Sequence, residues 1–395
     1  MKILIIYPHG NALNPHSGAE VRIWNLITAL TNQKINISVL HSNKSKGFED
    51  KNLKKKVKVY YYRELSLKGV PDWYISDLNP FFMLKLLKII RRNKIDIIQV
   101  EFPWGFLIIK LLARKNTFLI YDSLGVESEF IKIAMKNPNF PLIFKPFAKI
   151  LTRFYEKLVC KFANVIINVS NVDRNYYIKK YQIKKNKTIL IQIPSSINIA
   201  NKTYNKNLMI KCREKLNLPI DKTIVIFHGG ILHPPNKEAF DLIDTFISPN
   251  IKDPNILFVI AGYKLEKFRK NNIISLGFIE KLEDLLYSAN LAIVPIISGS
   301  GMRVKCIDYI NTAIPFISTK KGIEGIDFLI PGEDYILCET VNSDFIKNIN
   351  ELCNNREKRE NIHRNLLKKS NRINKKVIEN RIIKLYLKLI DQNKK

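Results

Sequence analysis

A short loop of glycine and serine leads into a segment whose charged side chains could bind a phosphorylated ligand. The loop is 298–301, and the segment after it carries Arg303, Lys305 and Asp308. Glycine lets the backbone approach a ligand closely, and the free N–H groups at the start of a helix attract phosphate oxygens. A carboxylate about two helical turns further on suits the hydroxyl groups of a ribose. These residue types in this order predict a site for a nucleotide-linked phosphate.

Arg303 is the most informative of these residues, because a helix that starts near Met302 would place it in the first helical turn. A cation there is unfavourable beside the positive end of the helix dipole. A bound diphosphate would remove that conflict, and Lys305 could add a second positive charge. An ordinary turn with a solvated basic face is the alternative, since short glycine patterns are weak evidence for a ligand.

The elements that position this loop follow from short apolar runs that alternate with helical patterns along the whole chain. Strands are expected in the first half at 2–8, 35–42, 56–63, 95–103, 117–123 and 163–170, and in the second half at 222–230, 255–262, 272–279, 291–298 and 315–322. Buried strands separated by helices indicate parallel βαβ units. We therefore expect an α/β protein with two Rossmann-like, doubly wound domains facing a cleft. Ligands of such sheets lie at the carboxyl ends of the strands.

A polar stretch without strong periodicity, 193–211, separates the two series of strands and reads as a linker. The expected domains are therefore 1–200 and 201–372. The last segment, 373–395, is basic and helical, and we expect its apolar face to pack back on the first domain.

Length and composition allow two buried cores and limit the classes of function. The chain has 395 residues, 46 % of them hydrophobic. No apolar run approaches the ~20 residues of a membrane-spanning helix. The opening "MKILIIYPHG" is too short for a signal peptide, so a cytoplasmic location is expected. Five widely spaced cysteines without a C-x-x-C pair predict neither a disulfide framework nor a zinc site.

The chain is strongly basic, with 65 Lys and Arg against 35 Asp and Glu and a net charge of +30. This charge favours anionic partners such as phosphorylated substrates, an acidic membrane surface or nucleic acid. A biased base composition that enriches lysine, isoleucine and asparagine together is an alternative cause. No recognisable nucleic-acid module accompanies the charge, so we do not expect nucleic acid as a partner.

The stretch 294–326 resembles the donor-site signature of glycosyltransferase family 4, which are nucleotide-sugar enzymes of the GT-B fold. The positions that match are Pro295, Gly299, Gly301, Arg303, Lys305, Pro315, Thr319, Gly322, Glu324 and Gly325. Asp308 stands where the family has a ribose-binding glutamate. Segments 17–30, 95–105, 121–130, 154–177 and 227–240 are similar to other family segments and follow in the family's order.

The resemblance implies a role for each matched residue. Donor-binding residues would be Gly18, Gly229, Gly230, Lys237, Gly299, Ser300, Gly301, Met302 and Asp308. Arg303 and Lys305 would stabilise the leaving nucleoside diphosphate, and His16 is a further catalytic candidate. Asp122 and Glu127 would lie on the acceptor side. The family transfers sugar with retention of configuration, and no D-x-D occurs here, so neither a metal nor another cofactor is expected.

Three positions depart from the family pattern. Ser300 stands where the wider family has a glutamate near the donor sugar, and Leu124 stands where the subgroup has an acceptor-side histidine. The P-N-G before the linker is replaced by Pro194, Ser195 and Ser196. Two functions follow: a glycosyltransferase that acts on a glycan or lipid-linked acceptor, or a catalytically inactive binding or scaffold protein of the same fold.

Two basic segments have the pattern of surface helices. In 144–162, Lys149, Arg153, Lys157 and Lys161 recur every fourth residue, next to Phe147, Leu151, Phe154, Leu158 and Phe162. The segment 81–94 is similar in character. Such helices suit an anionic membrane, which would make the protein peripheral on the inner membrane face. The alternative is a helix packed on the core with a solvated charged face.

Overall fold

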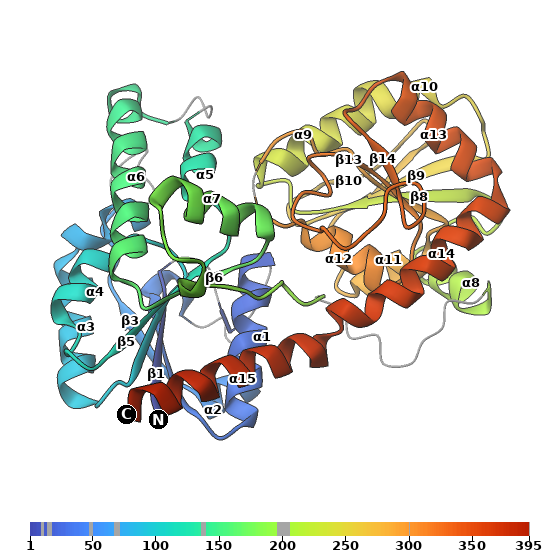
Figure 1. Cartoon of the computed structure of the whole chain (residues 1–395). Helices are drawn as coiled ribbons and strands as arrows, with labels where there is room; N and C mark the ends of the chain where they lie inside the picture. Colours follow the sequence, from blue (N-terminus) through green and yellow to red (C-terminus); the bar gives the residue numbers. More distant parts are fainter. Residues whose placement is uncertain are drawn as a thin grey trace. The chain divides into compact units, whose positions relative to one another are not determined.

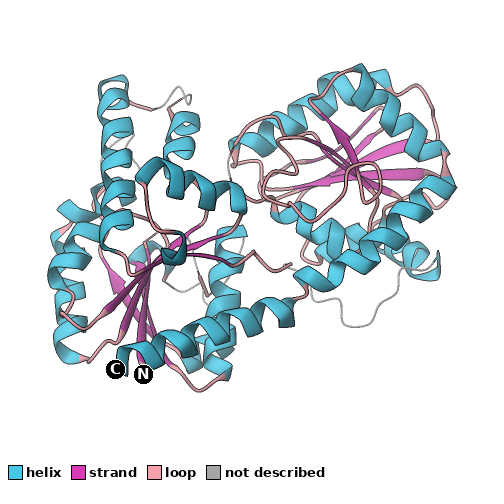
Figure 2. Ribbon diagram, in the orientation of Figure 1, coloured by secondary structure: helices cyan, strands magenta, loops and turns pink. Residues whose placement is uncertain are grey.

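The computed structural model describes residues 1–8, 12–13, 18–46, 50–66, 72–135, 140–195, 206–299 and 301–394. The chain forms two compact units, Met1–Gln192 with Ile378–Lys395, and Ile193–Val377. Each unit contains a seven-stranded sheet with helices on both faces (Figures 1 and 2). The linker predicted to lie between the domains falls partly in 196–205, outside the described residues.

The sheet of the first unit is parallel throughout. Its strands are β1 (Lys2–Tyr7), β2 (Asn36–Ser42), β3 (Lys58–Tyr62), β4 (Ile97–Val100), β5 (Phe118–Ser123), β6 (Val165–Asn168) and β7 (Thr188–Leu190). The spatial order is β3-β2-β1-β4-β5-β6-β7. The order reverses between β1 and β4, which makes this pair the switch point where ligands of doubly wound sheets bind.

Helices cover both faces of this sheet. They are α1 (Gly18–Asn32), η1 (Asn43–Ser45), α2 (Lys51–Lys56), η2 (Asp72–Leu78), α3 (Pro80–Arg92), α4 (Phe106–Leu112), α5 (Glu127–Ala134), η3 (Leu142–Phe144), α6 (Lys145–Phe162), α7 (Asn171–Tyr181), η4 (Lys185–Lys187) and α15 (Lys375–Lys394). One apolar core lies between the sheet, α1 and α15. A second core on the opposite face contains residues of α3, α4, α6 and α7. The carboxyl-terminal helix is thus part of the first unit's core.

The sheet of the second unit has the same winding. Its strands are β8 (Thr223–His228), β9 (Ile256–Ala261), β10 (Lys267–Lys270), β11 (Ile273–Leu276), β12 (Leu291–Val294), β13 (Phe316–Thr319) and β14 (Ile336–Cys338). The spatial order is β10-β11-β9-β8-β12-β13-β14, and only the edge strand β10 is antiparallel among the described residues. The order reverses between β8 and β12.

The helices of the second unit are α8 (Lys206–Lys215), α9 (Pro234–Leu242), η5 (Ile243–Ile247), α10 (Ser248–Asn250), α11 (Leu282–Ser288), α12 (Val304–Asn311), α13 (Ser343–Asn354), α14 (Arg356–Ser370) and η6 (Asn371–Ile373). Arg213 of α8 is fully buried, and its guanidinium donates to the Ser288 carbonyl and to Asn290 Oδ1. These bonds attach α8 to the segment after α11. No helix among the described residues is both long and apolar enough to span a bilayer.

Candidate active site

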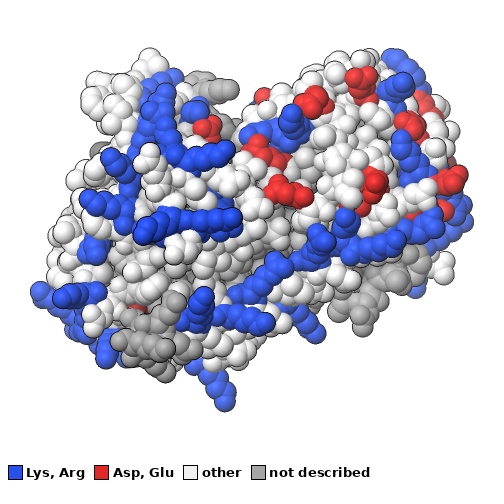
Figure 3. All heavy atoms as spheres, viewed as in Figure 1, with Lys and Arg blue, Asp and Glu red and all other residues white. Residues whose placement is uncertain are grey.

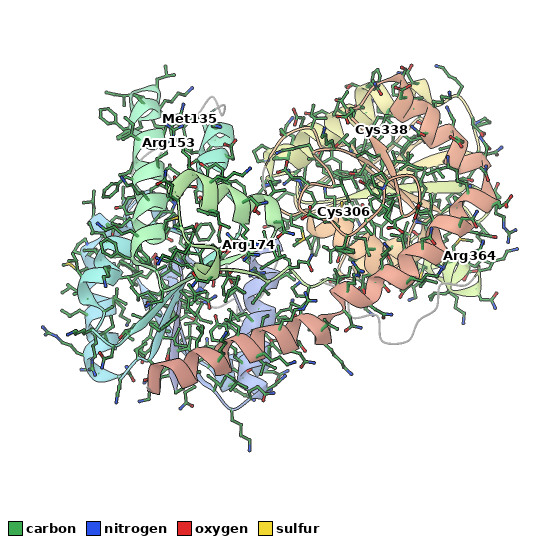
Figure 4. The ribbon with its side chains drawn as sticks, viewed as in Figure 1. Met135, Arg153, Arg174, Cys306, Cys338 and Arg364 are labelled. Atoms are coloured by element: carbon green, nitrogen blue, oxygen red, sulfur yellow. The ribbon has the colours of Figure 1, made fainter. Side chains whose placement is uncertain are left out.

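The predicted phosphate site lies at the switch point of the second sheet. Strand β8 ends at His228 and is followed by two glycines, while β12 leads into the loop before α12. The carboxyl ends of these two adjacent parallel strands therefore meet at one edge. Figure 4 labels Cys306, which lies on α12 directly after Lys305 and so marks this part of the unit.

Glycines allow the backbone segments at this edge to approach one another closely. A Cβ atom on Gly229 would lie 2.6 Å from Asn236 Nδ2, and one on Gly262 would lie 1.8 Å from the Gly229 carbonyl oxygen. Gly299 and Gly301 have φ angles of 101° and 79°, in the left-handed region that favours glycine. The local backbone therefore requires glycine at these positions.

Arg303 lies just before its helix and not in the first helical turn, where the sequence predicted it. Helix α12 begins at Val304, two residues after the predicted start near Met302, and Arg303 is its N-cap with extended backbone angles. The Arg303 side chain folds back and donates from Nη2 to the Ser298 carbonyl oxygen at 3.0 Å. Arg303 is 8 % exposed and Met302 is buried beside it. The guanidinium thus holds the glycine loop from inside the site.

Lys305 is a buried cation that points at the neighbouring strand. Its Nζ donates to Asn236 Oδ1 at 2.8 Å and lies 3.8 Å from the centroid of the Phe227 ring. Asn236 in turn donates from Nδ2 to the Gly230 carbonyl oxygen at 3.0 Å. Burial, the largest cause, lowers the pKa of Lys305 well below its usual value, and Arg303 lowers it further. Within the described part of the chain, no carboxylate lies within ion-pair distance of Lys305.

Asn236 is a site residue that sequence reasoning missed. It connects α9, the turn after β8 and the lysine of α12, although it lies 69 residues before Lys305. Its position inside the family-like segment 227–240 was the available signal. Lys237, which was predicted instead, is exposed and forms an ion pair with Asp241 at 2.9 Å along α9.

The carboxylate of Asp308 is held by Ser195, which lies in the segment after β7. Ser195 Oγ donates to Asp308 Oδ1 at 2.8 Å, and both side chains are almost completely buried. Ser195 belongs to the same compact unit as Asp308. Ser195, which stands where the family has the asparagine of P-N-G, thus places its hydroxyl against Asp308, the residue predicted to bind the ribose.

Two histidines near the cations were also missed. Burial, followed by Lys305, lowers the pKa of His228 to about 3. Burial, followed by Arg303 and Lys305, lowers the pKa of His233 to about 4. Both imidazoles are therefore neutral at pH 7, where they can serve only as neutral hydrogen-bonding groups. Fixed positive charge at this edge comes from Arg303, and Lys305 adds a charge while it is protonated.

In the first unit, Asp122 is engaged in a buried ion pair. Arg22 of α1 donates to its carboxylate from Nε at 3.1 Å and from Nη2 at 2.7 Å. Gln99 Nε2 lies between Asp122 and Glu101, 2.6 Å from Glu101 Oε1. Burial, and then the charge of Asp122, raise the pKa of Glu101 well above its usual value. This cluster joins α1 to the carboxyl ends of β4 and β5, beside the switch point.

Glu127, the second predicted acceptor-side residue, is the first residue of α5 and is buried. Burial, followed by repulsion from Glu156, raises its pKa to about 8. Glu156 accepts hydrogen bonds from the Ser128 amide and the Tyr181 hydroxyl. Glu127 is therefore largely protonated at pH 7.

The remaining predicted residues have simple placements. Gly18 is the first residue of α1, and Leu124 is half-buried in the turn after β5. His16 and Ser300 lie outside the described residues.

A basic site at the switch point of a doubly wound sheet is where α/β enzymes hold nucleotides. Comparison with known proteins identifies the family. Residues 16–193 match the profile of Glycosyltransferase Family 4, and residues 222–355 match that of Glycosyl transferases group 1. The two ranges cover more than three quarters of the chain. The chain belongs to the GT-B glycosyltransferases of family 4, group 1 type.

Similar proteins agree with this assignment. Chitobiosyldiphosphodolichol beta-mannosyltransferase of Candida albicans is 23 % identical over 326 residues, which are 73 % of this chain and 69 % of that protein. Sucrose-phosphate synthase from Thermosynechococcus elongatus superimposes with a TM-score of 0.77 at 16 % identity, covering 99 % of both chains. Anabaena Alr3699/HepE in complex with UDP-glucose gives a TM-score of 0.70 at 16 % identity, covering 98 % and 100 %. The predicted fold class, an α/β protein with two Rossmann-like domains, is confirmed.

Proposed function

We propose that the second unit holds a nucleotide-sugar donor at the carboxyl ends of β8 and β12, with the diphosphate beside Arg303 and Lys305. The observation that carries this proposal is Lys305, a buried cation next to a glycine loop. Burying an ammonium group is costly unless an opposite charge or hydrogen bonds compensate it. Phe227 and Asn236 supply part of that compensation, and a diphosphate would supply the rest.

Each proposed contact has a distinct role. The backbone at Gly229, Gly230, Gly299 and Gly301 approaches the ligand, and Asp308 accepts hydrogen bonds from the ribose hydroxyls. In the reaction, the bond between the anomeric carbon and the diphosphate oxygen breaks while an acceptor hydroxyl bonds to that carbon. The hydroxyl proton passes to the departing phosphate oxygen, on the same face, so the configuration is retained. Arg303 and Lys305 stabilise the charge that develops on the leaving diphosphate.

The acceptor is proposed to be a lipid-linked glycan held by the first unit. The similarity to a chitobiosyldiphosphodolichol mannosyltransferase supports this class of acceptor, and so does the fold shared with WaaG, a glycosyltransferase involved in lipopolysaccharide biosynthesis. Glu127, protonated at pH 7, can donate a hydrogen bond to an oxygen of the acceptor other than the attacking hydroxyl. The Asp122 carboxylate is already paired with Arg22. We therefore assign Asp122 a structural role, which is to hold α1 against the carboxyl ends of β4 and β5.

The test is thermal unfolding of the protein with a panel of nucleoside diphosphates and nucleotide sugars. A ligand at about 100 times its Kd adds about 2.7 kcal/mol, which raises Tm by about 5–11 °C for a unit of this size. Arg303→Ala should abolish the shift, whereas the exposed Lys252→Ala should keep it. The nucleotide sugar that binds is then incubated with lipid-linked acceptors, and the anomeric configuration of the product is read by NMR. A folded protein that no member of the panel stabilises would contradict the proposed donor site.

A further inference from the structure

Helix α6 has two apolar stripes, and the core uses only one of them. The residues that it buries are Ala148, Thr152, Tyr155, Glu156, Val159 and Cys160. The second stripe has the i, i+3, i+4, i+7 spacing of a single helix face and is solvent-exposed: Phe147, Ile150, Leu151 and Phe154, at 65, 68, 37 and 49 %. The core therefore does not require the two phenylalanines.

The preceding turn, η3, extends this exposed stripe. Leu142 and Ile143 are 78 % and 74 % exposed. We call Leu142, Ile143, Phe147, Ile150 and Phe154 the apolar tip. A contiguous exposed apolar surface of this kind marks a binding surface in a soluble protein.

The apolar tip lies at the functional edge of the first sheet. Helix α6 has 18 residues and is about 27 Å long, whereas the four residues of β6, which follows it, span roughly 13 Å. Because α6 runs back to the start of β6, its first turns extend past the carboxyl edge of the sheet. Figure 1 shows the beginning of α6 standing above that edge, beside α5. Glu127, at the start of α5, follows the same edge.

Positive charge flanks the apolar tip. Lys149, Arg153 and Lys157 are exposed on α6, and Figure 3 shows Lys and Arg side chains along this helix. Arg153 is labelled in Figure 4. The acidic residue of α6, Glu156, is buried and accepts hydrogen bonds from Ser128 and Tyr181. The exposed face of α6 therefore combines apolar side chains with cations alone.

We propose that the apolar tip and its flanking cations dock the first unit on an anionic lipid bilayer, with the tip in the boundary between headgroups and acyl chains. Lipid satisfies both features of the surface, because the headgroups neutralise the cations and the acyl chains bury the tip. A second copy of the chain fits less well, since a two-fold contact would bring identical cations face to face. Nucleic acid would neutralise the charge but leave the tip exposed.

The second predicted basic helix, α3, does not contact the apolar tip directly, because α4 lies between α3 and α6. Its exposed Leu84 and Met83 lie on a helix that packs on α4, and α4 packs on α6. Figure 2 shows these helices on one face of the sheet. The docking proposal therefore concerns α6 and η3, and it does not depend on the donor site of the second unit.

The test is sedimentation of the full chain with vesicles of phosphatidylcholine alone and with added phosphatidylglycerol. We expect binding to the anionic vesicles that weakens with salt. Phe147→Ser with Ile150→Ser should reduce the partition coefficient about tenfold or more, because burying each side chain in lipid is worth at least that factor. Lys149→Glu with Arg153→Glu should remove the preference for anionic lipid. The matched controls are the exposed pairs Ile220→Ser with Leu367→Ser, and Lys347→Glu with Lys368→Glu, all in the second unit.

A fluorescent probe gives a direct reading. Phe147→Trp should add to the emission of the three native tryptophans a component that shifts to the blue with vesicles and is quenched by lipids brominated in the acyl chain, whereas Leu367→Trp should not. Equal vesicle binding by the tip variant and the wild type would overturn the proposal. So would a dimer, seen by light scattering, that the tip variant loses, or salt-sensitive binding to nucleic acid in place of vesicles. Nucleotide stabilisation stays unchanged in every tip variant, which separates this test from that of the donor site.

Discussion

At the scale of single residues, the donor site is built around a lysine whose charge is costly. Lys305 is buried against Phe227, and burial lowers its pKa. An ordinary lysine titrates at 10.5, so Lys305 becomes neutral at a lower pH than an ordinary lysine. Below that pH it is a cation ready to bind an anion, and above it the attraction is lost.

This titration predicts opposite pH trends for binding and stability. In the pH window between the lowered pKa of Lys305 and the usual lysine value of 10.5, the affinity for a fully ionised diphosphate should fall as Lys305 loses its proton. In the same window the unfolded chain binds more protons than the folded one at this lysine. Its contribution to the free energy of unfolding therefore rises with pH in the absence of ligand. Calorimetric titration should show that the diphosphate affinity of the wild type falls as the pH rises. Lys305→Met should bind weakly at every pH, and the exposed Lys252→Met should keep the pH dependence of the wild type. A flat profile in the wild type would contradict this role.

The residues that sequence analysis missed are those brought in by long-range contacts. Arg303, Lys305 and Asp308 could be predicted because they follow one strand in one short segment. Asn236 and Ser195 contact them from 69 and 113 residues away, through hydrogen bonds that only the fold creates. Burial also depends on long-range contacts. No local sequence pattern therefore reveals that a carboxylate such as Glu127 is protonated at pH 7.

At the scale of elements, long apolar runs were predictable and short or polar ones were not. Each of the eleven predicted strands is present in the structure, and each except the half-exposed β3 contains a run of buried side chains. Strand β10 is polar and exposed along its length at the sheet edge, and β7 and β14 have three residues each. The polar β10 carries no apolar signal, whereas β7 and β14 are apolar but too short to be recognised without their pairing partners.

The loop before α12 gives a prediction at this scale. A Cβ on Gly299 would lie 2.8 Å from Arg303 Nη2 and 3.0 Å from Pro235 Cγ. Gly299→Ala should therefore displace the guanidinium and weaken nucleotide binding about tenfold, the usual effect of losing one charged hydrogen bond. Gly332→Ala is the matched control, because Gly332 also has a positive φ, 85°, with no atom within 4 Å of its would-be Cβ.

Both glycine variants should lose similar stability, about 1–2 kcal/mol, from the left-handed backbone alone. Denaturant unfolding measures that shared loss, and calorimetry measures the nucleotide affinity. Equal affinity in the two variants would show that the loop does not set the position of Arg303 for the ligand.

At the scale of the whole molecule, the chain builds its first unit from both ends of the sequence. Residues Ile378, Ile382, Leu385, Tyr386 and Leu389 of α15 lie in the same core as β1 and α1. The second unit, Ile193–Val377, is continuous in sequence. The core of the second unit is therefore complete within one fragment. Residues 1–192 alone lack α15, which covers one side of the core of the first unit.

This difference predicts how the two units behave when they are separated. Five apolar side chains that lose their burial cost roughly 8–15 kcal/mol, which is comparable to the whole stability of a domain. Residues 193–377 should therefore unfold cooperatively as an isolated fragment, with the near-ultraviolet circular dichroism of a packed core. Residues 1–192 should gain such a transition only when a peptide of residues 375–395 is added, and not with the same peptide carrying Ile382→Asp and Leu385→Asp. If residues 1–192 unfold cooperatively at the same temperature with and without the peptide, α15 covers a core that is already complete.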